Sequence, residues 1–275
     1  MRAPGLVACD IDGTLLDPTE RVSDRTAAVI RRMRSTGTPF VLVSGRPPRW
    51  IPQVAEAIAA DGYAVCGNGA VLYDIGADRV VSARLLQPAQ LAESAAALDA
   101  ALPGCALAAE RSTITAHVTV PPLVAEPRYR HPWRLDHRGD HDQIRTVPRD
   151  EVIAQSAMKL LVRKEDLPSG ELAAIAGQAL GDDVDVTFST DAGLIEVALA
   201  GVTKATGLAE VVRGYGLTSA DVLAFGDMPN DLSMLRWAGH GVAMANAHRV
   251  VRAAADEITA SNAEDGVAAV LERWF

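Results

Sequence analysis

Short apolar runs alternate with longer amphipathic segments in the first third of the chain. Three runs are apolar enough to form buried strands, namely Leu6–Cys9, Phe40–Val43 and Tyr63–Cys66. Between them, apolar residues recur at helical spacing over 23–33, with Ser23 as a favourable N-cap. A second helix is expected from Pro47 and Pro48 to about Ala60, because proline is tolerated in a first helical turn. This alternation predicts a parallel sheet with helices on both faces.

The same alternation returns near the end of the chain, after a middle part of different character. Here the pattern predicts a helix over 203–213, a strand over 222–225, a helix from about Pro229 and a short strand over 241–243. The middle part predicts strands and helices in mixed order: strands over 113–120 and 157–162, and helices over 88–102 and 166–180. We therefore expect a discontinuous core domain, 1–83 and 191–275, interrupted by an α+β insert over 84–190.

Carboxylates stand where two of the expected strands end. Asp10 and Asp12 follow the first apolar run directly, and Asp227 and Asp231 follow the run over 222–225. Ligand crevices of open α/β sheets lie at the carboxyl ends of the strands. If these carboxylates lie within a few ångströms of one another, about the contact distance of an ion pair, they need a compensating cation to stay ionised. A hard cation such as Mg²⁺ prefers oxygen ligands. Taken alone, the Asp12-Gly13 pair is more simply a turn that closes a strand.

A hydroxyl and a lysine complete the candidate chemistry. Ser44 precedes Gly45 at the end of the second expected strand, and Lys204 is one of only three lysines beside 23 arginines. A lysine at this place in so arginine-rich a chain indicates that a compact point charge is needed. A nucleophile, a metal, a donor and a fixed cation are what phosphoryl transfer requires.

Four sequence motifs follow one another in the chain: the segment 10–14, Ser44, Lys204 and the segment 226–231. In this order they resemble the motifs of the haloacid dehalogenase-like superfamily, and specifically its Cof-type subclass IIB. The resemblance covers nearly the whole chain, from the Asp10-Ile11-Asp12-Gly13-Thr14 segment to Asn230 and Asp231. It implies a Rossmann-like parallel sheet with helices on both faces and an inserted α+β cap domain. It also implies a phosphatase that uses Mg²⁺ and an aspartyl-phosphate intermediate.

The resemblance assigns a role to each motif residue. Asp10 is the expected nucleophile, Asp12 the general acid and base, and Ser44 and Lys204 the groups that bind the phosphoryl oxygens. Crowding by other carboxylates is expected to raise the pKa of Asp12. The metal ligands implied are Asp10, the backbone carbonyl of Asp12 and Asp227, with Asp231 either acting through a water or orienting Lys204.

Four further residues are expected to bind the substrate: Gly45, Arg46, Asn68 and Asn230. The Gly45 N–H would donate beside Ser44, and Arg46 would either approach the substrate or form an ion pair with the acidic groups. Asn68 lies in a Gly-Asn-Gly-Ala segment that is equally well a plain turn. Asn230 and Asp231 could also be helix N-caps, and Asn246 is expected to cap the helix that follows it.

These features favour a Mg²⁺-dependent phosphomonoesterase for small phosphorylated metabolites, with sugar phosphates as the expected substrates. A phosphomutase of the same superfamily would return the phosphoryl group to the sugar instead of to water. A receiver-like module, or a non-catalytic phosphosugar-binding regulator, is the alternative from another class. Asp12 argues against a receiver, because such a switch needs no acid for a leaving alcohol.

Composition limits the possible binding partners and the location of the protein. The net charge of −9 and the absence of a basic stripe argue against nucleic acid. Three cysteines far apart in the chain suggest buried thiols and no disulfide framework. No apolar run is long enough to cross a membrane and no signal peptide is recognisable, so a cytoplasmic location is expected. The sequence leaves the oligomeric state open.

The region 128–145 interleaves arginines and histidines with aspartates. It could form a cationic wall against a phosphorylated sugar or organic acid. We favour a solvated connecting loop, because long polar segments usually lie at the surface. The histidines have no regular metal-ligand spacing, so a zinc site is not expected.

Overall fold

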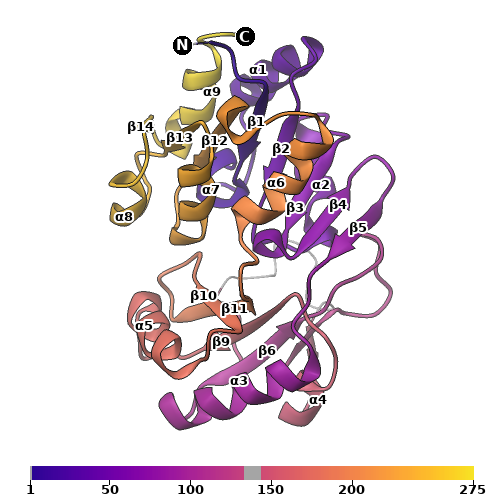
Figure 1. Cartoon of the computed structure of the whole chain (residues 1–275), viewed down its shortest axis with the longest axis vertical. Helices are drawn as coiled ribbons and strands as arrows, with labels where there is room; N and C mark the ends of the chain where they lie inside the picture. Colours follow the sequence, from indigo (N-terminus) through magenta and orange to yellow (C-terminus); the bar gives the residue numbers. More distant parts are fainter. Residues whose placement is uncertain (1, 133–143) are drawn as a thin grey trace. The chain divides into compact units, whose positions relative to one another are not determined.

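The computed structural model describes residues 2–132 and 144–275, and these form two compact units (Figure 1). The first unit contains the chain up to Val81 and from Thr203 onward, and the second contains Ser82–Val202. Each unit has its own sheet. The region 128–145 lies largely outside the described residues, since 133–143 are not described.

The first unit is built on an eight-stranded sheet in the order β14-β13-β12-β1-β2-β3-β4-β5. These strands are β1 (Leu6–Cys9), β2 (Phe40–Val43), β3 (Tyr63–Cys66), β4 (Val71–Asp74), β5 (Arg79–Ala83), β12 (Val222–Gly226), β13 (His240–Ala243) and β14 (Glu257–Ile258). The strands from β14 to β3 are parallel, whereas β4 is antiparallel to β3. Strand β1 is central and wholly buried, as its apolar sequence predicts.

Helices on this sheet begin and end where the local sequence favours it. They are α1 (Asp24–Ser35), α2 (Pro52–Ala57), α6 (Lys204–Gly214), α7 (Leu232–Trp237), α8 (Arg249–Arg252) and α9 (Gly266–Leu271). Ser23 caps α1 by accepting a hydrogen bond from the Thr26 N–H at 3.1 Å. Helices α1 and α9 pack together, and so do α6 and α7. Helices α6 and α7 lie in front of the sheet in Figure 1. The expected α/β class with a parallel core sheet is confirmed.

The second unit has a six-stranded sheet in the order β10-β11-β9-β6-β7-β8. The strands are β6 (Ala106–Glu110), β7 (Leu123–Ala125), β8 (Ile144–Thr146), β9 (Lys159–Arg163), β10 (Val184–Thr187) and β11 (Leu194–Leu199). Three helices accompany them: α3 (Pro88–Ala101), α4 (Arg149–Ile153) and α5 (Ser169–Ala179). Apolar residues of all three helices form one core with alternate residues of β6, β9 and β11.

Two expectations for the insert differ from the structure. The segment 113–120 is not a strand: Ile114 is 80% exposed and Val120 65% exposed, and neither lies in a sheet. Its β-branched residues raise strand propensity, but propensity without a pairing partner does not make a strand. The strand next to it is instead β6, whose alanines have low strand propensity.

The second boundary of the insert lies later than residue 190. Strand β11 pairs with both β9 and β10, so the chain up to Val202 belongs to the second unit. Among the described residues, no helix is long and apolar enough to cross a membrane.

Candidate active site

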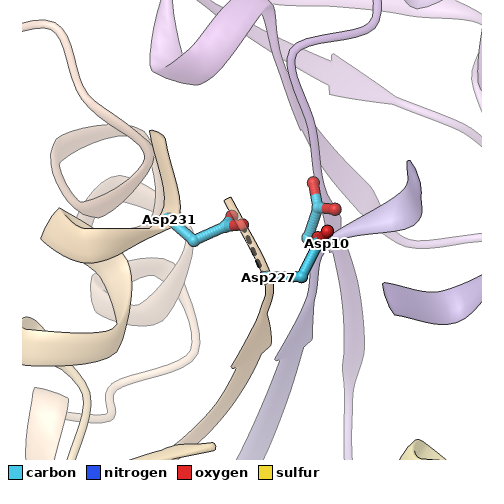
Figure 2. Close-up of side chains that lie close together, drawn as sticks. All are labelled: Asp10, Asp227 and Asp231. Carbon is cyan, nitrogen blue, oxygen red and sulfur yellow. Dashed lines mark hydrogen bonds between the residues drawn. The ribbon is translucent and has the colours of Figure 1, made fainter. Parts of the chain in front are cut away.

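Three buried aspartates meet at the carboxyl ends of β1 and β12. Asp10 directly follows β1, Asp227 directly follows β12, and Asp231 ends the helical turn Pro229–Asp231 that precedes α7 (Figure 2). One carboxylate oxygen from each lies within 4.8 Å of the others, and each residue is at most 6% exposed. Strands β1 and β12 are parallel neighbours with Cys9 opposite Phe225, so their ends bring Asp10 and Asp227 together.

Two glycines permit this close approach. Gly13 has a φ of +78°, and a Cβ there would lie 2.3 Å from Oδ2 of Asp227. At Gly226, a Cβ would lie 2.5 Å from the Cβ of Asp231. Any side chain at either position would therefore displace an acidic residue of the cluster.

Lys204 lies inside this cluster and is completely buried. Its Nζ donates hydrogen bonds to Oδ1 of Asp10 and to Oδ1 of Asp231, both at 2.5 Å. Lys204 is the first residue of α6, which Thr203 caps by accepting from the Thr206 N–H. The helix start therefore fixes the backbone from which the lysine reaches the acidic cluster.

Asp231 is held from two directions. Its Oδ2 accepts hydrogen bonds from the N–H groups of Asp227 and Met228, both at 2.9 Å. Its other oxygen is the one that binds Lys204. Of the two expected roles for Asp231, this arrangement favours the orientation of Lys204.

The charges of the cluster are unbalanced. Lys204 compensates one of the three carboxylates, which leaves two negative charges in a buried site. Burial, together with the neighbouring carboxylates, raises the pKa of Asp10 well above its usual range, although Lys204 opposes this shift. Burial and Asp231 likewise raise the pKa of Asp227 to about 7, against a hydrogen bond from Thr14. Burial alone would lower the pKa of Lys204, but Asp10 and Asp231 more than reverse that effect.

A divalent cation fits this imbalance. Two uncompensated negative charges and several carboxylate oxygens are the donor set that Mg²⁺ prefers. A bound cation would favour the ionised forms of Asp10 and Asp227, whose raised pKa values reflect the energy needed to keep them charged without one. The chemistry of the donors therefore agrees with the expected metal.

The Asp12 side chain forms hydrogen bonds with Arg46, whereas Asp10 and Asp231 bind Lys204. Its carboxylate receives two hydrogen bonds from Arg46, one from Nε at 2.7 Å and one from Nη2 at 2.5 Å. The Asp12 side chain is 55% exposed, whereas Arg46 is only 7% exposed. Of the two expected roles for Arg46, this two-point contact favours the ion pair with the acidic groups.

The remaining expected residues lie in the loops after β2 and β3 and in the turn that precedes α7. Oγ of Ser44 accepts a hydrogen bond from the Arg46 N–H at 3.1 Å, and Gly45 lies between these two residues. Nδ2 of Asn230 donates to Oδ1 of Asn68 at 3.1 Å, while Oδ1 of Asn230 is buried with no hydrogen-bond partner among the described residues. This hydrogen bond thus connects two of the expected substrate-binding residues, which lie far apart in the chain.

Thr14 and Asn246 have roles that the sequence did not predict. The Thr14 hydroxyl donates to Oδ1 of Asp227 at 2.9 Å. Asn246 was expected to cap the following helix, but α8 is capped by His248. Instead, Asn246 donates to the carbonyl of Gly13 at 2.8 Å and so supports the turn after Asp12. Thr14 lies in the first motif, yet only the fold shows that its partner is Asp227.

Comparisons with known proteins agree with this site. Residues 7–271 match the family of haloacid dehalogenase-like hydrolases. The chain is 28% identical to the 5-amino-6-(5-phospho-D-ribitylamino)uracil phosphatase YcsE of Bacillus subtilis (strain 168), over 98% of this chain and 95% of that protein. It is 26% identical to the pyridoxal phosphate phosphatase YbhA of Escherichia coli (strain K12), over 96% of each.

A solved structure shares the fold. The subclass IIB sugar phosphatase BT4131 superposes with a TM-score of 0.78 at 23% identity, over 98% of each chain. The match to the family model covers nearly the whole sequence, both units included. The chain therefore belongs to the haloacid dehalogenase-like hydrolases, as its Cof-type motifs predict.

Proposed function

We propose that this protein is a Mg²⁺-dependent phosphomonoesterase that acts on small phosphorylated metabolites, with sugar phosphates as its main substrates. The observation that carries the proposal is the buried Asp10 carboxylate, held at 2.5 Å by Lys204 beside Asp227 and Asp231. A carboxylate attacks phosphorus without first losing a proton, provided that its orientation is fixed and the charge on the phosphoryl group is compensated.

In the first step, a carboxylate oxygen of Asp10 attacks the phosphorus atom of the ester. The bond from phosphorus to the leaving oxygen breaks, and the Asp12 carboxylic acid donates its proton to the leaving alcohol. Asp10 then carries the phosphoryl group as an acyl phosphate. Lys204 keeps Asp10 in place throughout, since a buried lysine with two carboxylate partners has little freedom to move.

In the second step, Asp12 takes a proton from water, and the resulting hydroxide attacks phosphorus. Inorganic phosphate leaves and the Asp10 carboxylate is restored. Ser44 and the Gly45 N–H donate to the phosphoryl oxygens, and Asn68 and Asn230 form the adjoining polar wall. Mg²⁺, when held by Asp10, Asp227 and the Asp12 carbonyl, supplies positive charge to the phosphoryl oxygens.

Arg46 has a positioning role in this scheme. Its two hydrogen bonds hold the Asp12 side chain in one orientation. They favour the ionised carboxylate, which is the form of Asp12 that takes a proton from water in the second step. Arg46 therefore influences how readily Asp12 exchanges its proton.

The test is phosphate release from a panel of phosphate esters, with and without Mg²⁺. The panel should include sugar phosphates, pyridoxal phosphate and 5-amino-6-(5-phospho-D-ribitylamino)uracil, since relatives are named for the last two. Release that requires both Mg²⁺ and Asp10 supports the hydrolase. Isomerisation of a sugar phosphate without free phosphate would identify a phosphomutase, and a stable phosphoprotein without turnover would identify a regulator.

A further inference from the structure

The loop that follows strand β13 is attached to the segment that carries Asp227. Residues 244–248 form this loop, which connects β13 to α8. The Met244 N–H donates to the Gly226 carbonyl at 3.1 Å, and the His248 N–H donates to the Asp227 carbonyl at 2.8 Å. These two backbone hydrogen bonds fix both ends of the loop beside the carboxyl end of β12.

The side chain of Asn246 extends from the middle of this loop to the turn after Asp12. Its Nδ2 donates to the Gly13 carbonyl at 2.8 Å, and its Oδ1 accepts from the Asn262 N–H at 3.0 Å. A carbonyl can only accept and an N–H can only donate, so these two partners determine how the amide is oriented. An ionised aspartate at this position could not donate, and an apolar side chain could form neither bond.

The turn that Asn246 contacts sets the direction of a main-chain carbonyl. Asp12 has φ −81° and ψ 120°, and Gly13 has φ 78° and ψ −3°, which are typical of a type II turn. The Asp12 carbonyl belongs to the central peptide of that turn and is one of the expected metal ligands. Because glycine can adopt many backbone conformations, the direction of this carbonyl depends on the bonds that hold Gly13.

The next peptide unit leads to Asp227. The Gly13 carbonyl and the Thr14 N–H belong to one planar peptide, so the bond from Asn246 also restrains Thr14. The Thr14 hydroxyl donates to Oδ1 of Asp227 at 2.9 Å. Mg²⁺ requires its ligands at short and nearly fixed distances, so the separation of ligands from different loops affects its binding.

We propose that Asn246 is a positioning residue for the divalent cation: by joining the Gly13 turn to the loop 244–248, its amide sets the separation of the Asp12 carbonyl and the Asp227 carboxylate. This inference rests on the proposed function, from which the Mg²⁺ requirement is taken. Asn246 is exposed, and an exposed hydrogen bond contributes little to folding because water competes for both groups. Its loss should therefore weaken cation binding more than it weakens the fold.

The decisive variant is Asn246→Leu, which forms neither hydrogen bond and adds no charge. Calorimetric titration with MgCl₂, without any substrate, should give a Kd for Mg²⁺ about tenfold above that of the wild type. The Mg²⁺ concentration for half-maximal phosphate release should rise by the same factor. The melting temperature in EDTA should stay close to the wild-type value. A merely structural Asn246 predicts the opposite, a lower melting temperature in EDTA with an unchanged Kd.

Further variants separate positioning from general disturbance. Asn262→Ala removes the hydrogen bond from Nδ2 of Asn262 to the Leu16 carbonyl, which is 2.8 Å long, but keeps the N–H that donates to Asn246. It is the matched control, because it removes a bond to the same segment and should change the Kd by less than about twofold. Asn246→Gln keeps the amide on a longer side chain and should restore part of the affinity. If Asn246→Leu does not fold, Asn246→Ala replaces it in the same titration.

The outcomes distinguish this inference from the proposed function. Mg²⁺ binding that Asn246→Leu weakens supports the inference, even if the protein releases no phosphate from any ester. Mg²⁺-dependent phosphate release with the same Kd in the wild type and in Asn246→Leu supports the phosphatase and overturns the inference. The inference is also overturned if the wild-type protein binds no Mg²⁺, or if Asn262→Ala weakens binding as much as Asn246→Leu does.

Discussion

Both units bury charged side chains on a sheet, but they do so in different places. In the first unit, the charges lie in loops beyond the strand ends, where Lys204 contacts two carboxylates and a divalent cation fits the remaining charge. In the second unit, the charges lie within the strands, on one face of the sheet. Groups that react need loops that can position them, whereas a buried ion pair can be part of a rigid strand. Substitutions in the acidic cluster of the first unit should therefore act on kcat.

The strongest test of this contrast is Asp10→Asn. An amide cannot form the acyl phosphate, so phosphate release should fall by roughly 10⁴-fold or more while the fold is retained. Steady-state phosphate release measures the loss, and acid quenching followed by mass spectrometry shows whether the wild-type protein carries a phosphoryl group on Asp10. Asp24→Asn, an exposed change on α1, is the control. Activity near the wild-type level in Asp10→Asn would contradict the mechanism.

Removal of the metal should have the next largest effect. Chelation with EDTA is expected to lower kcat by about 10³-fold, because the charge on the phosphoryl oxygens is then compensated by Lys204 and neutral donors alone. Added Mg²⁺ should restore the rate in the wild type and much less so in Asp227→Asn. Full activity in EDTA would mean that the acidic cluster serves another purpose.

Arg46→Lys should have an intermediate effect. A lysine keeps the positive charge but cannot make the two-point contact with Asp12, so kcat should fall about ten- to a hundredfold with little change in KM. The pH profile of kcat should shift as well, because Asp12 loses its paired partner. Arg31→Lys, an exposed change on α1, is the matched control. A purely structural Arg46 would alter the melting temperature without altering the pH profile.

The smallest effect concerns stability and pH in the metal-free protein. The pKa of Asp227 is about 7 in the folded state, whereas an unfolded aspartate has a pKa of about 3.9. Between these values the folded state binds more protons, so the free energy of unfolding should decrease as the pH rises from about 4 to about 7. Urea unfolding in EDTA measures this slope. Asp227→Asn and saturating Mg²⁺ should each flatten it, and an unchanged slope in both cases would show that Asp227 does not titrate as described.

Much of the first unit could be predicted from the sequence because its signals are local. The apolar runs that precede Asp10 and Asp227 are parallel strands, and parallel strands end at the same edge. The contact between Arg46 and Asp12 could be named only as one of two options, since side-chain direction depends on the loop conformation. The roles of Thr14 and Asn246 depend on partners more than 200 positions away in the chain.

The second unit was harder to predict for a physical reason. Its polar cluster combines Glu110, Lys159 and Glu196 from three strands, and only the register of those strands places them on one face. The alanines of β6 do not indicate a strand, while the β-branched residues of 113–120 do so wrongly. Whether each of these two segments forms a strand depends on whether a neighbouring strand pairs with it, and a single sequence does not reveal that neighbour.

The pairing of β1 with β12 also has a consequence for synthesis of the protein. Leu6 pairs with Val222, so the central strand has to wait for a partner that is made more than 200 positions later in the chain. The whole second unit leaves the ribosome during that interval and can fold first. Until then β1 has an exposed edge, and unpaired edges promote association between nascent chains. Asp10 therefore gains its lysine and its neighbouring carboxylates only after residues 204–231 have been made.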